Sequence, residues 1–300
     1  MKLKLPSSKP LSKARPSAPP AATQTPAAEP APLWSSAAPG DAAPAVSKPP
    51  PKPVAASGGE PLTPPVGAPP TGAAVVIGQV LPMYFVGDES HSMAGPPIAA
   101  VNQGLIDLRD EVAKHPLIGK KVRFGIITFA DTAQTRLELS ELSEELVLPA
   151  LAPRGRGTSY ASAFEALRHT IPGDIALLKA GGYQVHRPSV FFLSDGQPTE
   201  KEDKWRTRLE ELKDPGFRER PNILAFGVGD ADPNVIRQLA SVPRYAFMMT
   251  DGVSTAGAIS EFATSMLNSM VSSAERLDQG EQTVQFEKPE GFVQLDAPLV

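Results

Sequence analysis

One carboxylate and two hydroxyls follow the first apolar segment of the chain, in the stretch GDESHSMAG: Asp88, Ser90 and Ser92. Because they occupy every second position, the three side chains of one tight turn can converge on a point while Glu89 and His91 face away. Three kinds of site are consistent with this stretch alone: a cation site, a serine nucleophile, and an ordinary turn whose side chains cap backbone groups.

Two later segments supply further oxygen ligands. Thr158 lies in RGRGTSYAS, which leads into a helical pattern, and Asp195 lies in LSDGQPTE, which leaves an apolar run. Two carboxylates and three hydroxyls make an all-oxygen set, which a hard cation prefers, and Mg²⁺ keeps several waters, so that few protein ligands suffice. We therefore expect a Mg²⁺ site, which Mn²⁺ could also occupy, with these ligands: Asp88, Ser90, Ser92, Thr158 and Asp195.

An ordinary turn accounts for one such segment, but not for three that converge. For Thr158 and Ser159 alone, N-capping of the following helix is the simpler explanation, since Thr and Ser are common caps. Capping and metal binding can coexist at these positions, so the cation site stays the favoured interpretation.

A serine hydrolase would place Ser90 on a strand-to-helix elbow between two glycines, but Asp88 and Ser92 stand there instead. Such an enzyme also needs a histidine after the acid in chain order, whereas the last histidine, His186, precedes Asp195. The phosphate-binding pattern G-x-x-x-x-G-K-[ST] does not occur in the sequence. We therefore expect a binding protein and not an enzyme.

The composition narrows the class of partner. The 300 residues carry a formal charge of −4, which provides no basic field for nucleic acid. Cysteine is absent, which excludes disulfides and thiolate ligands and fits a reducing compartment. The sequence has neither the apolar stretch of a secretory signal nor a run of about 18 apolar residues. We expect a cytoplasmic protein that binds neither nucleic acid nor membrane.

Composition also divides the chain. Residues 1–72 are dominated by Pro, Ala, Ser and Gly and offer too little apolar surface to offset the entropy of ordering, which predicts a disordered tail. Residues 73–276 alternate apolar runs with helical patterns, over a length typical of one domain. Residues 277–300 are expected to form a loosely ordered tail, with an added edge strand at Thr283–Phe286 as the alternative.

The folded region predicts an α/β domain. Its strand-like segments are Pro82–Val86, Lys121–Phe129, Thr135–Leu139, Ser189–Leu193, Asn222–Val228 and Tyr245–Met249. Most are nearly apolar throughout, as in parallel strands buried on both faces, whereas Thr135–Leu139 alternates and is expected to form a hairpin at the sheet edge. Helical patterns between them predict a doubly wound, mostly parallel six-stranded sheet with helices on both faces. In such sheets ligands bind where the strands end, which brings the three segments to one edge.

The sequence resembles the von Willebrand factor type A (VWA) domain over about Leu81–Ala274. DESHS matches the D-x-S-x-S pattern of that family, and Thr158 and Asp195 fall where the family supplies its remaining metal-site residues. More narrowly, RGTSYASAFEAL and FFLSDGQPTE are similar to the TerY-like branch of bacterial cytoplasmic VWA proteins. The resemblance implies a Rossmann-like fold and a metal-ion-dependent adhesion site (MIDAS).

In that family Ser90 and Ser92 would bind the cation directly, Asp88 and Asp195 mainly through water, and Thr158 in either way. The resemblance also implies that an acidic side chain of a partner protein completes the coordination, so that the metal clamps a ligand and performs no chemistry. For the TerY-like branch it implies a stress-response or tellurium-resistance system with kinase or phosphatase partners. A metal-independent scaffold of the same fold is the alternative.

The sequence departs from the family pattern at two positions near the site. His91 stands where Gly is common, and Gly87 replaces a bulkier apolar residue. We expect His91 to point to solvent. Arg156 lies close to the site, where its charge could repel a metal or attract an acidic ligand.

Overall fold

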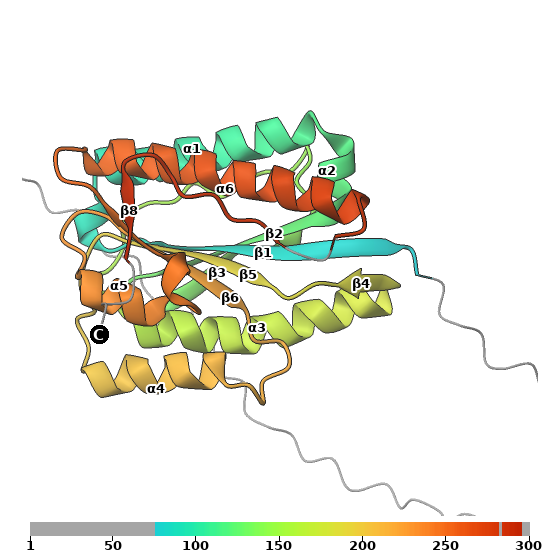
Figure 1. Cartoon of the computed structure of the whole chain (residues 1–300). Helices are drawn as coiled ribbons and strands as arrows, with labels where there is room; N and C mark the ends of the chain where they lie inside the picture. Colours follow the sequence, from blue (N-terminus) through green and yellow to red (C-terminus); the bar gives the residue numbers. More distant parts are fainter. Residues whose placement is uncertain (1–75, 282–283, 296–300) are drawn as a thin grey trace, which may run out of the picture. The chain divides into compact units, whose positions relative to one another are not determined.

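The structure, a computed structural model, describes residues 76–281 and 284–295, so the tail predicted at residues 1–72 lies outside the described part of the chain. Within that part, the strands form one sheet in the order β3-β2-β1-β5-β6-β7-β8, and the short β4 pairs with the start of β1 (Figure 1). The strands are β1 Gly78–Asp88, β2 Val122–Phe129, β3 Ala133–Ser140, β4 Tyr183–Val185, β5 Ser189–Ser194, β6 Asn222–Gly227, β7 Ala246–Met249 and β8 Phe292–Gln294. All six predicted strands are present, and β4 and β8 add to them.

The middle of the sheet is parallel. β1 pairs with β2 on one side and with β5 on the other, so that Phe85 lies opposite both Ile126 and Phe191. Every residue of β2 and β5 is buried, which explains why both sequences are largely apolar. The two edges are antiparallel: β3 pairs with β2, and β8 pairs with β7. The predicted fold class and the predicted hairpin edge at β3 are confirmed.

Helices cover both faces of the sheet (Figure 1). One face carries α1 Pro96–Ala113, α2 Pro116–Lys121 and α6 Thr255–Asp278, whose buried hydrophobic side chains belong to one apolar cluster. The other face carries α3 Tyr160–Ala180, α4 Glu202–Lys213 and α5 Pro233–Leu239, whose buried residues belong to a second. None of the helices among the described residues is long and apolar enough to cross a membrane.

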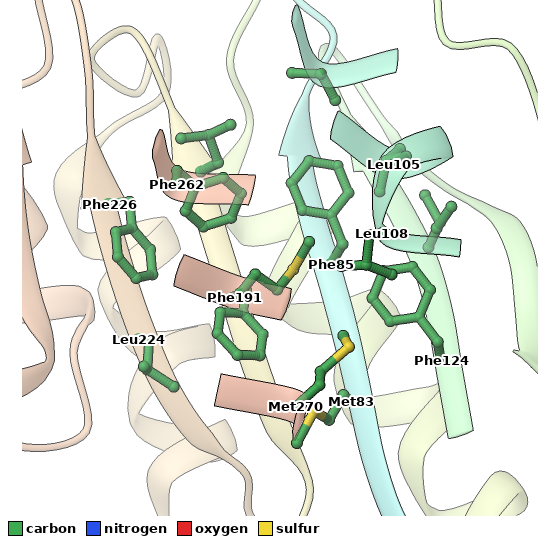
Figure 2. Packing of buried hydrophobic residues seen from close by; sticks show 14 of the residues in the cluster. Met83, Phe85, Leu105, Leu108, Phe124, Phe191, Leu224, Phe226, Phe262 and Met270 are labelled. Atoms are coloured by element: carbon green, nitrogen blue, oxygen red, sulfur yellow. The ribbon is translucent and has the colours of Figure 1, made fainter. Parts of the chain in front are cut away.

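Phenylalanines from neighbouring strands pack under α6 (Figure 2). The ring of Phe262 on this helix lies 4.7 Å from that of Phe226 and 6.0 Å from that of Phe85. Phe191 packs against Phe262 as well, at 6.5 Å. Burial of each such side chain contributes about 1.5–3 kcal/mol. The contacts fix β1, β5 and β6 relative to one another, and so determine where their carboxyl ends meet.

The segment after α6 returns to the sheet. Phe292, in β8, is 1% exposed, and its ring lies 5.9 Å from that of Phe226. Phe286 packs edge-on against the rings of Phe191 and Tyr245. Two phenylalanines therefore anchor this segment, although its sequence is otherwise rich in polar residues, Pro and Gly.

Residues 277–281 and 284–295 are the described part of the loosely ordered tail predicted at residues 277–300, and they contain the end of α6 and the strand β8. The added edge strand lies at Phe292–Gln294 and not at the alternative position, Thr283–Phe286. Thr283 itself is outside the described residues, and residues 284–286 are not in a strand.

Candidate metal centre

Asp88 is the last residue of β1, and its side chain is buried. Its Oδ1 accepts a hydrogen bond from the backbone N–H of Ser90 at 2.8 Å, and its Oδ2 accepts one from Ser194 Oγ at 2.7 Å. Ser194 ends β5, the strand paired with β1. The carboxylate is therefore held between two neighbouring strand ends, at the edge of the sheet where open α/β folds bind ligands.

Three side-chain oxygens lie in a row beside this carboxylate. Ser90 Oγ and Ser92 Oγ are 2.9 Å apart, and Ser92 Oγ donates to Asp195 Oδ1 at 2.9 Å. Ser90 and Ser92 belong to the turn formed by the 3-10 helix η1, His91–Met93, whereas Asp195 directly follows β5. The structure thus brings together candidate ligands that are separated by a hundred residues in the sequence.

Thr158 belongs to a loop that is hydrogen-bonded to the loop of Asp195. The N–H of Thr158 donates to Thr199 Oγ1 at 3.0 Å, and the N–H of Thr199 donates to the Thr158 carbonyl at 3.0 Å. Thr158 is 5% exposed, and its hydroxyl has no hydrogen-bond partner among residues 76–281 and 284–295. The third predicted segment therefore adjoins the second and offers an oxygen that is not otherwise used.

The capping role falls to the neighbouring residue. Ser159 is the N-cap of α3, and its Oγ accepts a hydrogen bond from the Ser162 N–H at 3.3 Å. Glu200 adds to the cap, because its carboxylate accepts from Ser159 Oγ at 3.0 Å and from the Ala161 N–H at 2.6 Å. Capping thus explains Ser159 and leaves Thr158 available as a ligand.

Asp131, just after β2, fixes the loop that precedes Thr158. Its carboxylate accepts hydrogen bonds from the N–H groups of Gly157 at 2.7 Å and Arg156 at 3.2 Å. A Cβ atom at Gly155 or Gly157 would lie 2.4 or 2.5 Å from these carboxylate oxygens, and Gly155 has a φ of +72°. The two glycines are therefore required by the close approach of Asp131.

Glu89 faces away from the oxygen row, as predicted. Its side chain has no exposed surface, and Oε2 forms an ion pair with Arg154 Nε at 2.6 Å. Arg154 is bound a second time by its backbone N–H, which donates to the Glu89 carbonyl at 2.7 Å. This contact attaches the D-x-S-x-S turn to the loop that carries Thr158.

The oxygen spacing fits an octahedral divalent cation. Neighbouring ligands that each lie about 2.1 Å from Mg²⁺ are about 3 Å apart, and the two hydroxyl oxygens expected to bind directly, Ser90 Oγ and Ser92 Oγ, are 2.9 Å apart. Within the described residues there is no group of three or more His, Cys, Asp or Glu side chains that could hold a metal. A cation bound here would need hydroxyl oxygens as well, and the row provides them.

Burial raises the pKa of both carboxylates at the site. For Asp88 burial raises the pKa to about 6, although the hydrogen bonds from Ser90 and Ser194 act in the opposite direction. For Asp195 burial also raises the pKa, and the nearby charge of Asp230 adds to this effect. Neither carboxylate is ion-paired with a described cationic side chain, so a bound cation would supply the missing positive charge.

The serine nucleophile finds no support in the geometry. Ser90 Oγ is hydrogen-bonded to Ser92, and His91 is exposed, as predicted. His186 is bonded instead to Gln79 near the start of β1, at 2.7 Å. Among the described residues, the Ser90 hydroxyl therefore has no histidine partner that could act as its base.

Several supporting residues could not be identified from the sequence. Ser194, Thr199 and Asp131 each hold a candidate ligand or its loop by hydrogen bonds to residues far away in the chain. Of the three, only Ser194 could have been suspected from the sequence, because its hydroxyl immediately precedes Asp195 at the end of a buried strand.

The chain is similar to proteins of one family. The family model of the von Willebrand factor type A domain matches residues 83–264. The pilus adhesin SpaC from Lactobacillus rhamnosus GG is 15% identical with a TM-score of 0.52, over 67% of this chain and 31% of that chain. Proximal thread matrix protein 1 from the mussel byssus, with a zinc-occupied MIDAS motif, is 20% identical with a TM-score of 0.45, over 66% and 47%.

A von Willebrand factor type A protein from Catenulispora acidiphila is 11% identical with a TM-score of 0.45, over 64% of this chain and 43% of that chain. The matched region thus spans less than half the length of each of these solved chains. Comparison with curated proteins finds no match. At 15% identity, the likeness to SpaC indicates a similar fold and nothing finer.

Proposed function

Because the chain belongs to the von Willebrand factor type A domain family, we propose that it is a protein-binding module whose Mg²⁺ site captures an acidic side chain of a partner. The observation that carries this proposal is the row formed by Ser90 Oγ, Ser92 Oγ and Asp195 Oδ1. In a turn that only caps backbone groups, these hydroxyls would bond to the main chain. Here the two hydroxyls bond to each other and to the Asp195 carboxylate, so that the two serine oxygens lie side by side, as two neighbouring ligands of a small hard cation do.

The five candidate ligands would have different roles in metal binding. Ser90, Ser92 and Thr158 would hold the cation through hydroxyl oxygens. Asp88 already accepts a protein hydrogen bond on each carboxylate oxygen, so that it, like Asp195, would act mainly through water and supply negative charge. When bound, Mg²⁺ offers a coordination position to a carboxylate oxygen of the partner. Binding, and not catalysis, is the expected result.

The alternative is a scaffold of the same fold that binds partners without a cation. Such a scaffold would retain two buried carboxylates, Asp88 and Asp195, that no cationic side chain in the described part of the chain compensates. Uncompensated buried charge lowers stability, and a metal site is the function that accounts for this cost.

A finer role rests on sequence resemblance alone. The similarity of RGTSYASAFEAL and FFLSDGQPTE to the TerY-like branch supports a cytoplasmic role in a bacterial stress response, such as tellurium resistance, with a kinase or phosphatase partner. Affinity purification of the full chain with and without a chelator tests this role. A signalling enzyme that chelation releases would support it, whereas partners retained equally in both conditions would contradict it.

Calorimetric titration of the full chain with Mg²⁺ tests the metal site itself. We expect one Mg²⁺ per chain, with binding lost in Ser92→Ala. Ser162→Ala is a matched control, because Ser162 Oγ donates only to the Ser159 carbonyl inside the first turn of α3. No binding by the wild-type chain at several millimolar Mg²⁺ would refute the proposal.

A further inference from the structure

The loops that follow β1, β2 and β5 use the acidic side chains nearest the candidate metal centre internally. Apart from the two candidate ligands, Glu89 is paired with Arg154, and Asp131 accepts two backbone N–H groups. Glu200 caps α3 and also forms an ion pair with Lys204 at 3.1 Å. None of these three carboxylates remains free to neutralise another cation in the same loops.

Two cations in these loops remain unpaired. Arg156 and Lys201 are both exposed, and neither side chain has a hydrogen bond, ion pair or ring contact with any residue that the structure describes. We refer to Arg156 and Lys201 as the basic rim.

The basic rim adjoins the metal centre. Thr158 and Thr199 are joined by two hydrogen bonds; Arg156 precedes Thr158 by two residues, and Lys201 follows Thr199 by two. Two residues of chain span at most about 7 Å, which is comparable to the reach of these long side chains. Because the Arg156 N–H donates a hydrogen bond to Asp131, the backbone position from which the Arg156 side chain extends is fixed.

On the side of the metal centre opposite the basic rim, the exposed charge is negative. Asp230, which follows β6, is exposed, and its backbone N–H donates a hydrogen bond to the Asp195 carbonyl at 3.0 Å. A ligand arriving at the centre therefore meets the unpaired cations Arg156 and Lys201 on one side, where α4 begins with Glu202 and Asp203, and the exposed Asp230 on the side of β6.

We propose that the basic rim selects a partner in which further acidic side chains flank the carboxylate that binds the metal. This inference rests on the proposed function and specifies its partner. A lone carboxylate would satisfy the metal and leave Arg156 and Lys201 unpaired, whereas an acidic cluster would pair with them at the same time. Complementary charge of this kind acts mainly on specificity and on the rate of association.

The variant that tests the basic rim is the full chain with Arg156→Gln and Lys201→Gln. Lys179→Gln is the matched control, because Lys179 is also exposed and unpaired among the described residues, but lies at the opposite end of α3. With Mg²⁺ alone as the probe, removal of two nearby positive charges should tighten binding about fivefold at low ionic strength, and much less at high salt. The control should bind Mg²⁺ as the wild type does.

A second probe is a pair of immobilised peptides of equal length, one with a single Asp among Gly and Ser, the other with Glu on both sides of that Asp. In Mg²⁺, the wild type and Lys179→Gln should prefer the Glu-flanked peptide, and the rim variant should lose this preference. Unchanged Mg²⁺ affinity together with an unchanged preference would overturn the inference while the proposed function stands. Absence of Mg²⁺ binding by the wild type would instead remove both.

Discussion

Ser194 Oγ donates a hydrogen bond of 2.7 Å to Asp88 Oδ2 across two paired strands that end at the candidate metal centre. The other carboxylate oxygen of Asp88 accepts the Ser90 N–H, so that the orientation of the carboxylate is fixed from both sides. Outer residues that orient metal ligands in this way reduce the reorganisation that binding requires.

Replacement of this outer hydroxyl should weaken metal binding without removing a ligand. We expect Ser194→Ala to lower Mg²⁺ affinity about tenfold or more, since loss of such orienting partners costs about 10–100-fold in other metal sites. Ser189→Ala is the control: Ser189 is equally buried at the start of the same strand, away from the centre. Equal losses in the two variants would show that the effect is one of strand packing.

Asp88 should lower the stability of the metal-free protein at neutral pH. Its pKa is about 6 in the folded protein against a usual value of 3.8, so the folded state binds this proton more tightly than the unfolded state does. The stability that protonated Asp88 contributes is therefore present below pH 4 and is lost as the pH rises through 6. A shift of roughly two units corresponds to about 3 kcal/mol at pH 7.

Asp88→Asn removes the charge and keeps the size of the side chain. In urea unfolding with a chelator present, we expect this variant to be more stable than the wild type at pH 7, by up to about 3 kcal/mol, and to lose most of that advantage at pH 4. If Asp88→Asn is instead less stable than the wild type, and by the same amount at pH 7 and at pH 4, then Asp88 does not carry a buried, uncompensated charge.

The ion pair between Glu89 and Arg154 should matter most when only one partner is removed. Arg154→Met leaves the Glu89 carboxylate buried without its cation, and we expect a loss of about 3–5 kcal/mol in the free energy of unfolding. Adding Glu89→Gln to that variant should recover a large part of the loss, because the unpaired charge is then gone. Additive losses in the double variant would mean that the pair is not coupled.

The segment after α6 should contribute to the stability of the domain. Phe292→Ala removes a ring that is 1% exposed, and we expect unfolding in urea to become easier by about 3–5 kcal/mol. Val293→Ala, at the next position but 47% exposed, should change stability by less than about 1 kcal/mol. If Phe292→Ala lowers the free energy of unfolding no more than Val293→Ala does, β8 does not form part of the folded domain.

The long elements were predictable because their own residues identify them. The apolar runs at β1, β2, β5 and β6 are buried on both faces, and the alternation at β3 indicates an edge. β4 and β8 could not be predicted, since each has three residues and depends on pairing with β1 or β7. Nothing within such short segments distinguishes them from loops.

The candidate ligands were predictable for a different reason. Asp88, Ser90 and Ser92 are close in the sequence, and a parallel sheet brings Asp195 to the same edge, so residue type and topology suffice. The contacts that hold these residues were not predictable. Asp131 and Thr199 act on the Thr158 loop from other segments, through backbone groups that every residue has.

A crystal structure of the full chain grown with Mn²⁺ tests the metal centre most directly, because Mn²⁺ prefers the same oxygen ligands as Mg²⁺ and scatters anomalously. We predict one anomalous peak at about 2.2 Å from both Ser90 Oγ and Ser92 Oγ, on the side of Asp195. A chain that leaves this position empty at several millimolar Mn²⁺, or binds the ion elsewhere, would contradict the account.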